Sequence, residues 1–354
     1  MADHAAEEVT LTRLPSGVEV TTTVHAYGPA DGPTVYVQAA QHGREVNGTA
    51  VLRRLHDRLV GADLSGRVVA VPVADPLTFD HASYTTPEPL DAVNSNMNRV
   101  WPGDPDGTLH ERMAASLWAR ASEADAIVDL HTGSPDMLTH VVVTAGHGPS
   151  RRLADAFGTD LHLLEPAGEA VLEAFEEEGS GRAGDPGGGP PGSQGAAVTA
   201  DGHAADDEWD DRDFDGKLRV VAARHGIPTI TPELAHNRQL VEEAVEAGVG
   251  GLLDVLRQQG VLPGDPEPTD DPTVARNHLG RVRAADSGLF RADPDRSVGE
   301  RVTAGTRLGV LYDPASYERL QVATADRDGV LYSIAQEATV TAGDALARVA
   351  EITG

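Results

Sequence analysis

Three short motifs place residues that bind metal ions or move protons directly after apolar, strand-like segments. They cover residues 41–45 (QHGRE), 129–133 (DLHTG) and 228–233 (PTITPE). In open α/β sheets ligands gather beyond the carboxyl ends of the strands, so the three motifs can converge at one edge of a sheet. Two histidines and one glutamate, with a fourth position left open, form a known set of catalytic zinc ligands. The sequence therefore indicates a metal site built from separate strands.

The first motif contains His42 and Glu45, whose spacing alone is weak evidence. The same His-x-x-Glu spacing recurs at His4 and His162. A loop histidine followed by an acid that the helix dipole favours would give this pattern without any metal. The setting of His42 adds weight, because an apolar strand precedes it, Gly43 lets the backbone turn, and a helical pattern follows.

The other two motifs are also ambiguous when each is taken alone. His131 could serve only to satisfy a backbone group, and Glu233 could be a solvated acid that leads a helix. Asp129 lies two residues before His131, on the same side of a strand, and could orient its imidazole as an outer carboxylate. The metal hypothesis therefore depends on the three motifs occurring together.

Short apolar runs alternate with helical patterns through most of the chain. Between the first two runs, Val51, Leu52, Leu55 and Leu59 fall on one helical face. The predicted strands cover 34–39, 68–73, 126–130, 140–144 and 229–231, and further helices cover 109–121, 218–224 and 239–256. This order predicts an α/β fold, with a mostly parallel or mixed sheet and helices on both faces.

Two stretches rich in glycine, proline and acid interrupt this order. Residues 176–215 have few apolar side chains to offset the entropy cost of ordering, so we interpret them as a flexible insertion rather than an ordered lid. Residues 263–272 (PGDPEPTDDP) are typical of a domain linker. Beyond it the helical period gives way to short β runs, at 308–311, 320–323, 329–333 and 346–352. We expect an α/β domain over 1–262 and a small all-β module over 273–354.

The chain is strongly acidic. Its 354 residues hold 56 Asp and Glu against 28 Lys and Arg, a net charge of −28, and Lys217 is the single lysine. This charge argues against nucleic acid or an anionic membrane as a partner. The acidic, arginine-over-lysine composition resembles that of proteins from a halophile, where salt screens self-repulsion.

Cysteine is absent, which excludes disulfides, a cysteine nucleophile and thiolate metal ligands. The first ten residues lack the apolar core of a signal peptide, and no segment approaches the length of a membrane span. We therefore expect a soluble, cytoplasmic protein whose metal ligands are His, Asp or Glu.

Four motifs occur in order between residues 33 and 260. They are HGREVNG at 42–48, NMNRVWPG at 96–103, DLHTG at 129–133 and PTITPEL at 228–234. Together they resemble the succinylglutamate desuccinylase/aspartoacylase family, which has a zinc carboxypeptidase-like fold. The resemblance implies one zinc ion per chain, bound by His42, Glu45 and His131, with Glu233 as the general base and acid.

The resemblance also implies a substrate clamp. Asn98 and Arg99 fall on the Asn-Arg pair that binds substrate in this family, commonly at its carboxylate. A guanidinium offers a planar fork suited to a carboxylate. Arg99 could instead tether its own loop through backbone carbonyls.

This chain departs from the family pattern at one position. In the family, an arginine usually lies nine residues after an Asn-Pro pair and helps polarise the scissile carbonyl. Here the pair is Asp75-Pro76, and residues 82–85 read ASYT, without arginine. Tyr84 could donate a hydrogen bond to the substrate instead, or could only pack in its loop. Zinc alone, or an arginine from elsewhere in the chain or from a partner subunit, could also take this role.

The C-terminal module extends the resemblance. Residues 287–290 (SGLF), 298–305 (VGERVTAG) and 328–331 (DGVL) are similar to the β module of bacterial and archaeal deacylases in this family, which is related to lipoyl/biotinyl hairpin domains. A carrier domain needs a lysine at its hairpin tip, and Lys217 lies outside this module. Carrier function is therefore excluded, and we expect a wall or an oligomerisation element.

These observations predict a zinc-dependent hydrolase that cleaves the amide bond of an N-acyl amino acid or a similar small N-acyl amine. The bond would be a non-peptide carbon–nitrogen bond, cleaved by metal-activated water with Glu233 moving the proton. The expected partner is the small N-acylated substrate, with a homo-oligomer as an option. Two alternatives stay open: a metallocarboxypeptidase acting on peptides, and a non-catalytic metal- or ligand-binding protein in which Glu233 is idle.

Overall fold

The computed structural model describes residues 4–91, 93–133, 136–166, 214–267, 269, 271–277 and 280–353. The predicted insertion at 176–215 lies outside the described residues, apart from Phe214 and Asp215. No helix in the described ranges has both the length and the apolar character that a bilayer span requires.

The elements follow the predicted alternation of strands and helices. The strands up to the linker region are β1 (His4–Arg13), β2 (Glu19–Tyr27), β3 (Thr34–Ala39), β4 (Arg67–Val71), β5 (Ala126–Gly133), β6 (His140–Thr144), β7 (Leu161–Glu165) and β8 (Thr229–His236). The helices are α1 (Asn47–Leu59), α2 (Pro76–Asp80), α3 (Leu109–Ala121), α4 (Gly148–Phe157), α6 (Leu218–Arg224) and α7 (Glu242–Gln258), with a 3-10 turn at Met97–Arg99. The later strands are β9 (Thr273–Arg276), β10 (Val282–Arg283), β11 (Gly288–Ala292), β12 (Arg301–Val302), β13 (Arg307–Tyr312), β14 (Arg319–Thr324), β15 (Gly329–Ile334), β16 (Ala338–Val340) and β17 (Ala345–Ile352).

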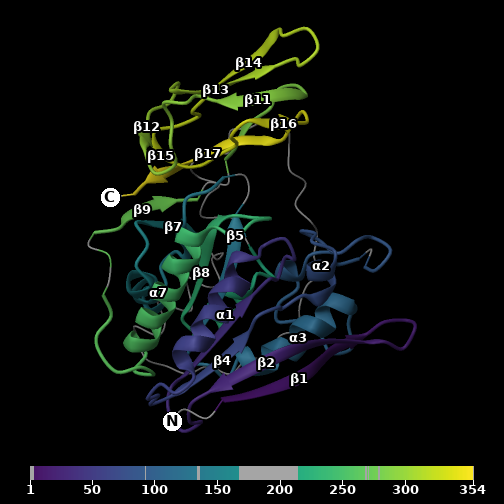
Figure 1. The fold of residues 1–354 in the computed structure, drawn as a ribbon, viewed down its shortest axis with the longest axis vertical. Coiled ribbons are helices and arrows are strands. Elements are labelled where there is room, and N and C mark those ends of the chain that lie inside the picture. Colours follow the sequence, from purple (N-terminus) through teal and green to yellow (C-terminus); the bar gives the residue numbers. More distant parts are fainter. Residues whose placement is uncertain are drawn as a thin grey trace.

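A mixed sheet of 13 strands runs through the described chain (Figure 1). Its order is β1-β2-β4-β3-β5-β8-β6-β7-β9-β17-β15-β12, with β10 paired to β17. The neighbours β4, β3, β5 and β8 are parallel, whereas β6 is antiparallel to β8. The predicted α/β class is confirmed, and the sheet is mixed.

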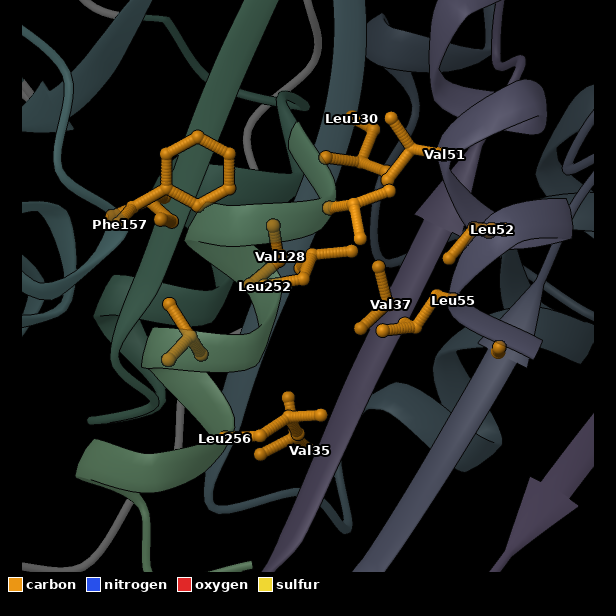
Figure 2. Close-up of a cluster of buried hydrophobic side chains, with 14 of the residues drawn as sticks. Val35, Val37, Val51, Leu52, Leu55, Val128, Leu130, Phe157, Leu252 and Leu256 are labelled. Atoms are coloured by element: carbon orange, nitrogen blue, oxygen red, sulfur yellow. The ribbon is translucent and has the colours of Figure 1, made fainter. Parts of the chain in front are cut away.

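Helices cover both faces of this sheet. Along β3 successive side chains alternate between the faces, so Val35 and Val37 join the core beneath α1, α4 and α7 while Tyr36 joins the core beneath α3 and α6. The first core contains the predicted apolar face of α1, including Leu55. Figure 2 shows side chains of β3 and β5 meeting those of α1 and α7. Each fully buried Val or Leu contributes about 1.5–3 kcal/mol to the free energy of folding. This packing fixes the positions of the strand ends relative to one another.

The C-terminal strands continue the same sheet and add a second one. β9 is parallel to β7 and antiparallel to β17, so backbone hydrogen bonds connect the chain on either side of residues 263–272. A four-stranded sheet of order β14-β13-β11-β16 lies beyond β17, at the end of the molecule farthest from β1 (Figure 1). The predicted all-β character of the segment after 273 agrees with these strands, while the division into 1–262 and 273–354 stays a prediction.

Candidate metal centre and active site

The three predicted motifs meet because their strands are neighbours. β3, β5 and β8 lie side by side and run in one direction, so their carboxyl ends share one edge of the sheet. Two of the predicted strands were too short, because β5 extends to Gly133 and β8 to His236. His131 and Glu233 therefore lie inside paired strands, opposite each other in register, rather than in loops beyond them.

His42, Glu45 and His131 form a buried cluster. The Nδ1 atom of His42 lies 2.9 Å from Glu45 Oε1, and the Nδ1 atom of His131 lies 3.0 Å from Glu45 Oε2. One ligand atom from each residue lies within 4.8 Å of the others. Burial alone would raise the pKa of Glu45, but the two histidines lower it to about 2, so this carboxylate stays charged.

The outer nitrogens of both histidines have partners, which suits a metal site. His131 Nε2 lies 3.0 Å from Asp129 Oδ2, and His42 Nε2 lies 3.2 Å from Asn96 Oδ1. With the proton on each Nε2, the Nδ1 lone pairs face the space beside Glu45, as metal ligands require. The donor set, its burial and its orientation therefore fit a zinc ion.

Asp129 lies where an outer carboxylate is expected, and further residues hold it there. Gln41 donates to Asp129 Oδ2 at 2.7 Å and accepts a hydrogen bond from Trp101 Nε1 at 2.9 Å. Asn96, Trp101 and Gln41 were not singled out as site residues in the sequence. All three lie in or next to the four motifs, so their position in the motifs was the sequence signal that could have identified them.

Gly43 lies in a turn, as predicted, and a second constraint also acts on it. A side chain there would place its Cβ 1.9 Å from the backbone oxygen of Thr78, so glycine is required because the α2 segment passes close by. This close approach brings the loop after β3 against the start of α2.

Glu233 lies beside the cluster and is partly exposed to the cavity. Burial raises the pKa of its carboxyl to about 7; the nearby charge of His131 opposes this rise, while Glu45 adds to it. A carboxyl that titrates near neutral pH can both accept and return a proton.

Asn98 and Arg99 lie on the 3-10 turn and line the same cavity. The Asn98 side-chain oxygen accepts a hydrogen bond from the backbone N–H of Leu218 at 3.2 Å, which ties the turn to the start of α6. Arg99 donates to the backbone oxygen of Asn98, the kind of contact that the loop-tether alternative requires. Its guanidinium still lines the cavity, so the substrate role of Arg99 stays a prediction.

Tyr84 packs directly on the candidate metal centre. Its ring stacks on the His42 ring, with 4.0 Å between the centroids, and the guanidinium carbon of Arg44 lies 4.8 Å above the Tyr84 centroid. The Nε atom of Arg44 is buried and has no hydrogen-bond partner among the described residues. Arg44, which belongs to the HGREVNG motif, was not predicted as a site residue.

The cluster opens into a cavity of about 820 Å³ whose lining is unusually basic. The basic lining residues are Arg44, Arg99, Lys217, Arg219, Arg238, Arg281 and Arg348. These seven belong to a total of 28 Lys and Arg in a chain of net charge −28. The acids in the same lining are Glu45, Glu165, Glu233 and Asp344. Sequence patterns missed most of these cations, because they come from segments far apart in the chain.

Glu165 of β7 is neutralised within this cavity. Lys217 Nζ and Asn277 Nδ2 donate to it at 2.9 and 2.7 Å, and Arg219 forms a further ion pair. Burial alone would raise the pKa of Glu165, but Lys217 and Arg219 lower it to about 2. The single lysine of the chain is therefore part of the cavity.

The fold and the donor set define an α/β protein with a candidate metal site at the strand ends. Residues 31–258 match the succinylglutamate desuccinylase/aspartoacylase catalytic domain. The chain therefore belongs to the succinylglutamate desuccinylase/aspartoacylase family, whose members are deacylases of acylated amino acids.

The chain is also similar to a deacetylase in sequence and to solved structures in fold. N-alpha-acetyl-L-2,4-diaminobutyric acid deacetylase of Halomonas elongata is 27% identical over 334 residues, which cover 91% of this chain and 83% of the relative. A succinylglutamate desuccinylase/aspartoacylase from Rhodobacter sphaeroides superimposes with a TM-score of 0.74 at 24% identity, covering 100% of this chain and 96% of that one. The product-bound Ectoine utilization protein EutE (DoeB) from Ruegeria pomeroyi gives a TM-score of 0.74 at 20% identity, covering 99% and 95%.

Proposed function

We propose that this protein is a zinc-dependent amidohydrolase that removes the acyl group from a small, carboxylate-bearing N-acyl amino acid. The observation that carries this proposal is the convergence of His42, Glu45 and His131, with Glu233 beside them, at one edge of the sheet. A simple metal-binding protein would not need a second carboxyl, with a raised pKa, next to the ligands.

The chain's own groups divide the work. His42, Glu45 and His131 would bind zinc, which supplies a Lewis acid that activates water and polarises the amide carbonyl. Glu233 would accept the proton of the attacking water and then deliver it to the departing amine. Asp129 would hold His131 in the tautomer that leaves Nδ1 for the ion.

Arg44 would stabilise the negative charge that develops on the carbonyl oxygen. Its Nε is a buried donor on the cavity wall beside His42, and within the part of the chain that the structure describes it has no hydrogen-bond partner. Such a preorganised donor is worth about 2.7–4 kcal/mol in the transition state. The stacking of Tyr84 between His42 and Arg44 favours a positioning role for the tyrosine ring.

The charge of the cavity indicates the substrate class. Seven basic groups in an otherwise acidic protein favour an anionic ligand. Glu165 cannot act as a free receptor for a substrate amine, because Lys217 and Arg219 already neutralise it. We therefore expect N-acyl derivatives of acidic amino acids to be better substrates than those of 2,4-diaminobutyrate.

A metallocarboxypeptidase remains the second candidate, and the cavity wall argues against it. Tyr332 of β15 and Arg348 of β17 line the cavity together with the metal cluster, so C-terminal strands occupy one side of it. An extended peptide would need that side to be open.

A substrate panel tests the proposal. Purified protein in molar salt would be given N-acetyl, N-succinyl and N-formyl derivatives of aspartate, glutamate and 2,4-diaminobutyrate, and a set of dipeptides, with and without a chelator. We expect chelator-sensitive release of the free amino acid, fastest for the acidic derivatives. Hydrolysis of dipeptides alone would favour the carboxypeptidase, and binding without any hydrolysis would favour the non-catalytic alternative.

A further inference from the structure

A second group of metal-type ligands lies outside the active site. His4, His25 and His56 each offer a ring nitrogen, and these atoms lie within 4.8 Å of one another. Among the described residues, this trio and the His42 cluster are the groups of three or more such ligands that converge in this way. His4 was noted in the sequence only for a His-x-x-Glu spacing, but Glu7 lies on the other face of β1, so the spacing itself is irrelevant.

The three histidines come from three different elements. His4 begins β1 and pairs in register with Tyr27 of β2, and His25 lies two residues before Tyr27 on the same face. His56 belongs to α1, which packs on that face. In the sheet order of the described residues β1 is an edge strand with β2 as its partner, so a link from His4 to α1 would add a contact at the start of this strand.

The ring nitrogens lie close enough together for one metal ion to bind all three. His4 Nε2 lies 3.0 Å from His25 Nδ1, a contact in which the two rings share one proton that a metal ion can replace. His56 Nδ1 lies 2.9 Å from the hydroxyl of the buried Tyr27. When His56 Nδ1–H donates to that oxygen, the Nε2 lone pair of His56 is available for a metal ion. Metal-binding histidines commonly donate their other ring N–H to an oxygen in this way.

A ring contact also suits metal binding. The Tyr27 ring stacks on the His4 ring with 4.8 Å between centroids, which restricts the rotation of an exposed side chain.

We propose that His4, His25 and His56 form a second metal site, which takes a first-row divalent ion that prefers imidazole, such as zinc or copper(II), and clamps β1 and β2 to α1. Three histidines with an open fourth position match this ligand preference. The site is separate from the active site, because α1 begins beside the catalytic cluster and His56 lies nine residues after Asn47, about 14 Å along the helix axis.

Zinc stoichiometry tests the proposal on the full chain. The parent protein and its variants would be loaded with excess zinc, passed through gel filtration and assayed for metal per chain. We expect two zinc ions in the parent, and one in His25→Ala and in His56→Ala with unchanged deacylase activity. The matched control His225→Ala removes an exposed histidine of no cluster and should keep two.

The His131→Ala variant separates this site from the catalytic one. It should keep one zinc, which is lost when His25→Ala is added, and zinc should raise the Tm of the single variant but not of the double one. A parent that binds one zinc, lost in His131→Ala, would overturn the second site and leave the proposed function intact. One zinc lost in His25→Ala but kept in His131→Ala would instead support the second site and contradict the catalytic one.

Copper(II) gives an independent measurement in case a variant folds poorly. In the His131→Ala background, we expect an electron paramagnetic resonance spectrum with hyperfine structure from three imidazole nitrogens. Copper binding that needs His4 but survives both His25→Ala and His56→Ala would overturn the proposal, because it would show chelation by His4 and its neighbouring backbone. Circular dichroism of each variant without metal checks that the fold is retained.

Discussion

Two buried clusters combine histidine with carboxylates, but only one lines the cavity. In the second cluster His110 of α3 lies between two acids, with Nε2 3.1 Å from Asp75 Oδ2 and Nδ1 2.9 Å from Asp91 Oδ2. The remaining oxygens of both acids accept backbone N–H groups: Asp75 caps α2, and Asp91 caps the turn that follows it. Every group of this cluster is therefore used inside the protein.

The candidate metal centre differs from it in two respects. Its two histidines both direct Nδ1 at a single carboxylate, Glu45, and all three residues line the cavity. The residue types are the same in the two clusters, so residue type does not decide the role. What separates a catalytic cluster from a structural one is convergence of lone pairs and access to the cavity, and the predictions below test that distinction.

The largest effect should come from removing a metal ligand. His131→Ala should lose the catalytic zinc. A general base contributes about 10²–10⁴-fold to the rate, and activity should fall by more than this factor. Elemental analysis and the deacylase assay measure the two effects, with His225→Ala as the control. Full catalytic-site occupancy in the variant would remove His131 from the metal centre.

Glu233→Gln should separate chemistry from metal binding. The amide has similar size but cannot accept the proton of water, so turnover should fall by about 10²–10⁴-fold while catalytic zinc and Tm stay unchanged. Measuring kcat and zinc content on the same preparation checks both parts. Near-parental turnover would show that the base lies elsewhere.

His110→Ala should have the opposite profile, losing stability and keeping zinc. It leaves Asp75 and Asp91 buried without their cation, which typically costs about 3–5 kcal/mol. Denaturant unfolding gives the free energy of unfolding, and elemental analysis gives the zinc content. Loss of catalytic zinc in a folded His110→Ala protein would contradict the distinction between the two clusters.

The destabilisation should also depend on pH. Burial alone would lower the pKa of His110, but Asp75 and Asp91 raise it above its ordinary 6.5. A raised histidine pKa contributes stability that is complete below about pH 6.5 and is lost as pH rises through the folded-state pKa. The difference in unfolding free energy between parent and His110→Ala should therefore be larger at pH 6 than at pH 9.

Much of the candidate metal centre was predictable because parallel strands deliver their ends to one edge. The runs at 34–39, 126–130 and 229–231 identified β3, β5 and β8, and the residues that follow them are the ones that converge. The N-terminal hairpin was missed, because the first five residues of β1 are exposed and its apolar alternation is limited to Val9 and Leu11. The His4 cluster was missed for the same reason, since it exists only once β1 and β2 pair.

The cavity itself could not be predicted. Lys217 and Arg219 come from the start of α6, whereas Arg281 and Arg348 come from the C-terminal segment. No spacing along the chain connects them, and their convergence depends on β9 joining the two parts of the sheet. Likewise, the missing family arginine near Tyr84 was visible in the sequence, but the placement of Arg44 over Tyr84 was not.

A pair of variants tests which residue stabilises the developing negative charge. Arg44→Gln should lower kcat by about 10²–10³-fold, the usual cost of one such donor. Tyr84→Phe keeps the ring that stacks on His42 and removes only the hydroxyl, so it should leave kcat close to the parent value. The reverse result, with kcat and kcat/KM reduced together in Tyr84→Phe and KM unchanged, would assign the donor to Tyr84.

The smallest of these effects should come from Arg99→Lys, which keeps the charge and removes the planar fork. A hydrogen bond to a charged group is worth about 1.5–3 kcal/mol, so losing one of two would weaken binding of a carboxylate-bearing substrate by roughly tenfold or more. An amidated analogue of the same substrate lacks that carboxylate and should lose less. Parallel KM measurements on the acid and the amide decide the matter, because equal losses on both would mean that Arg99 only tethers its loop through the backbone of Asn98.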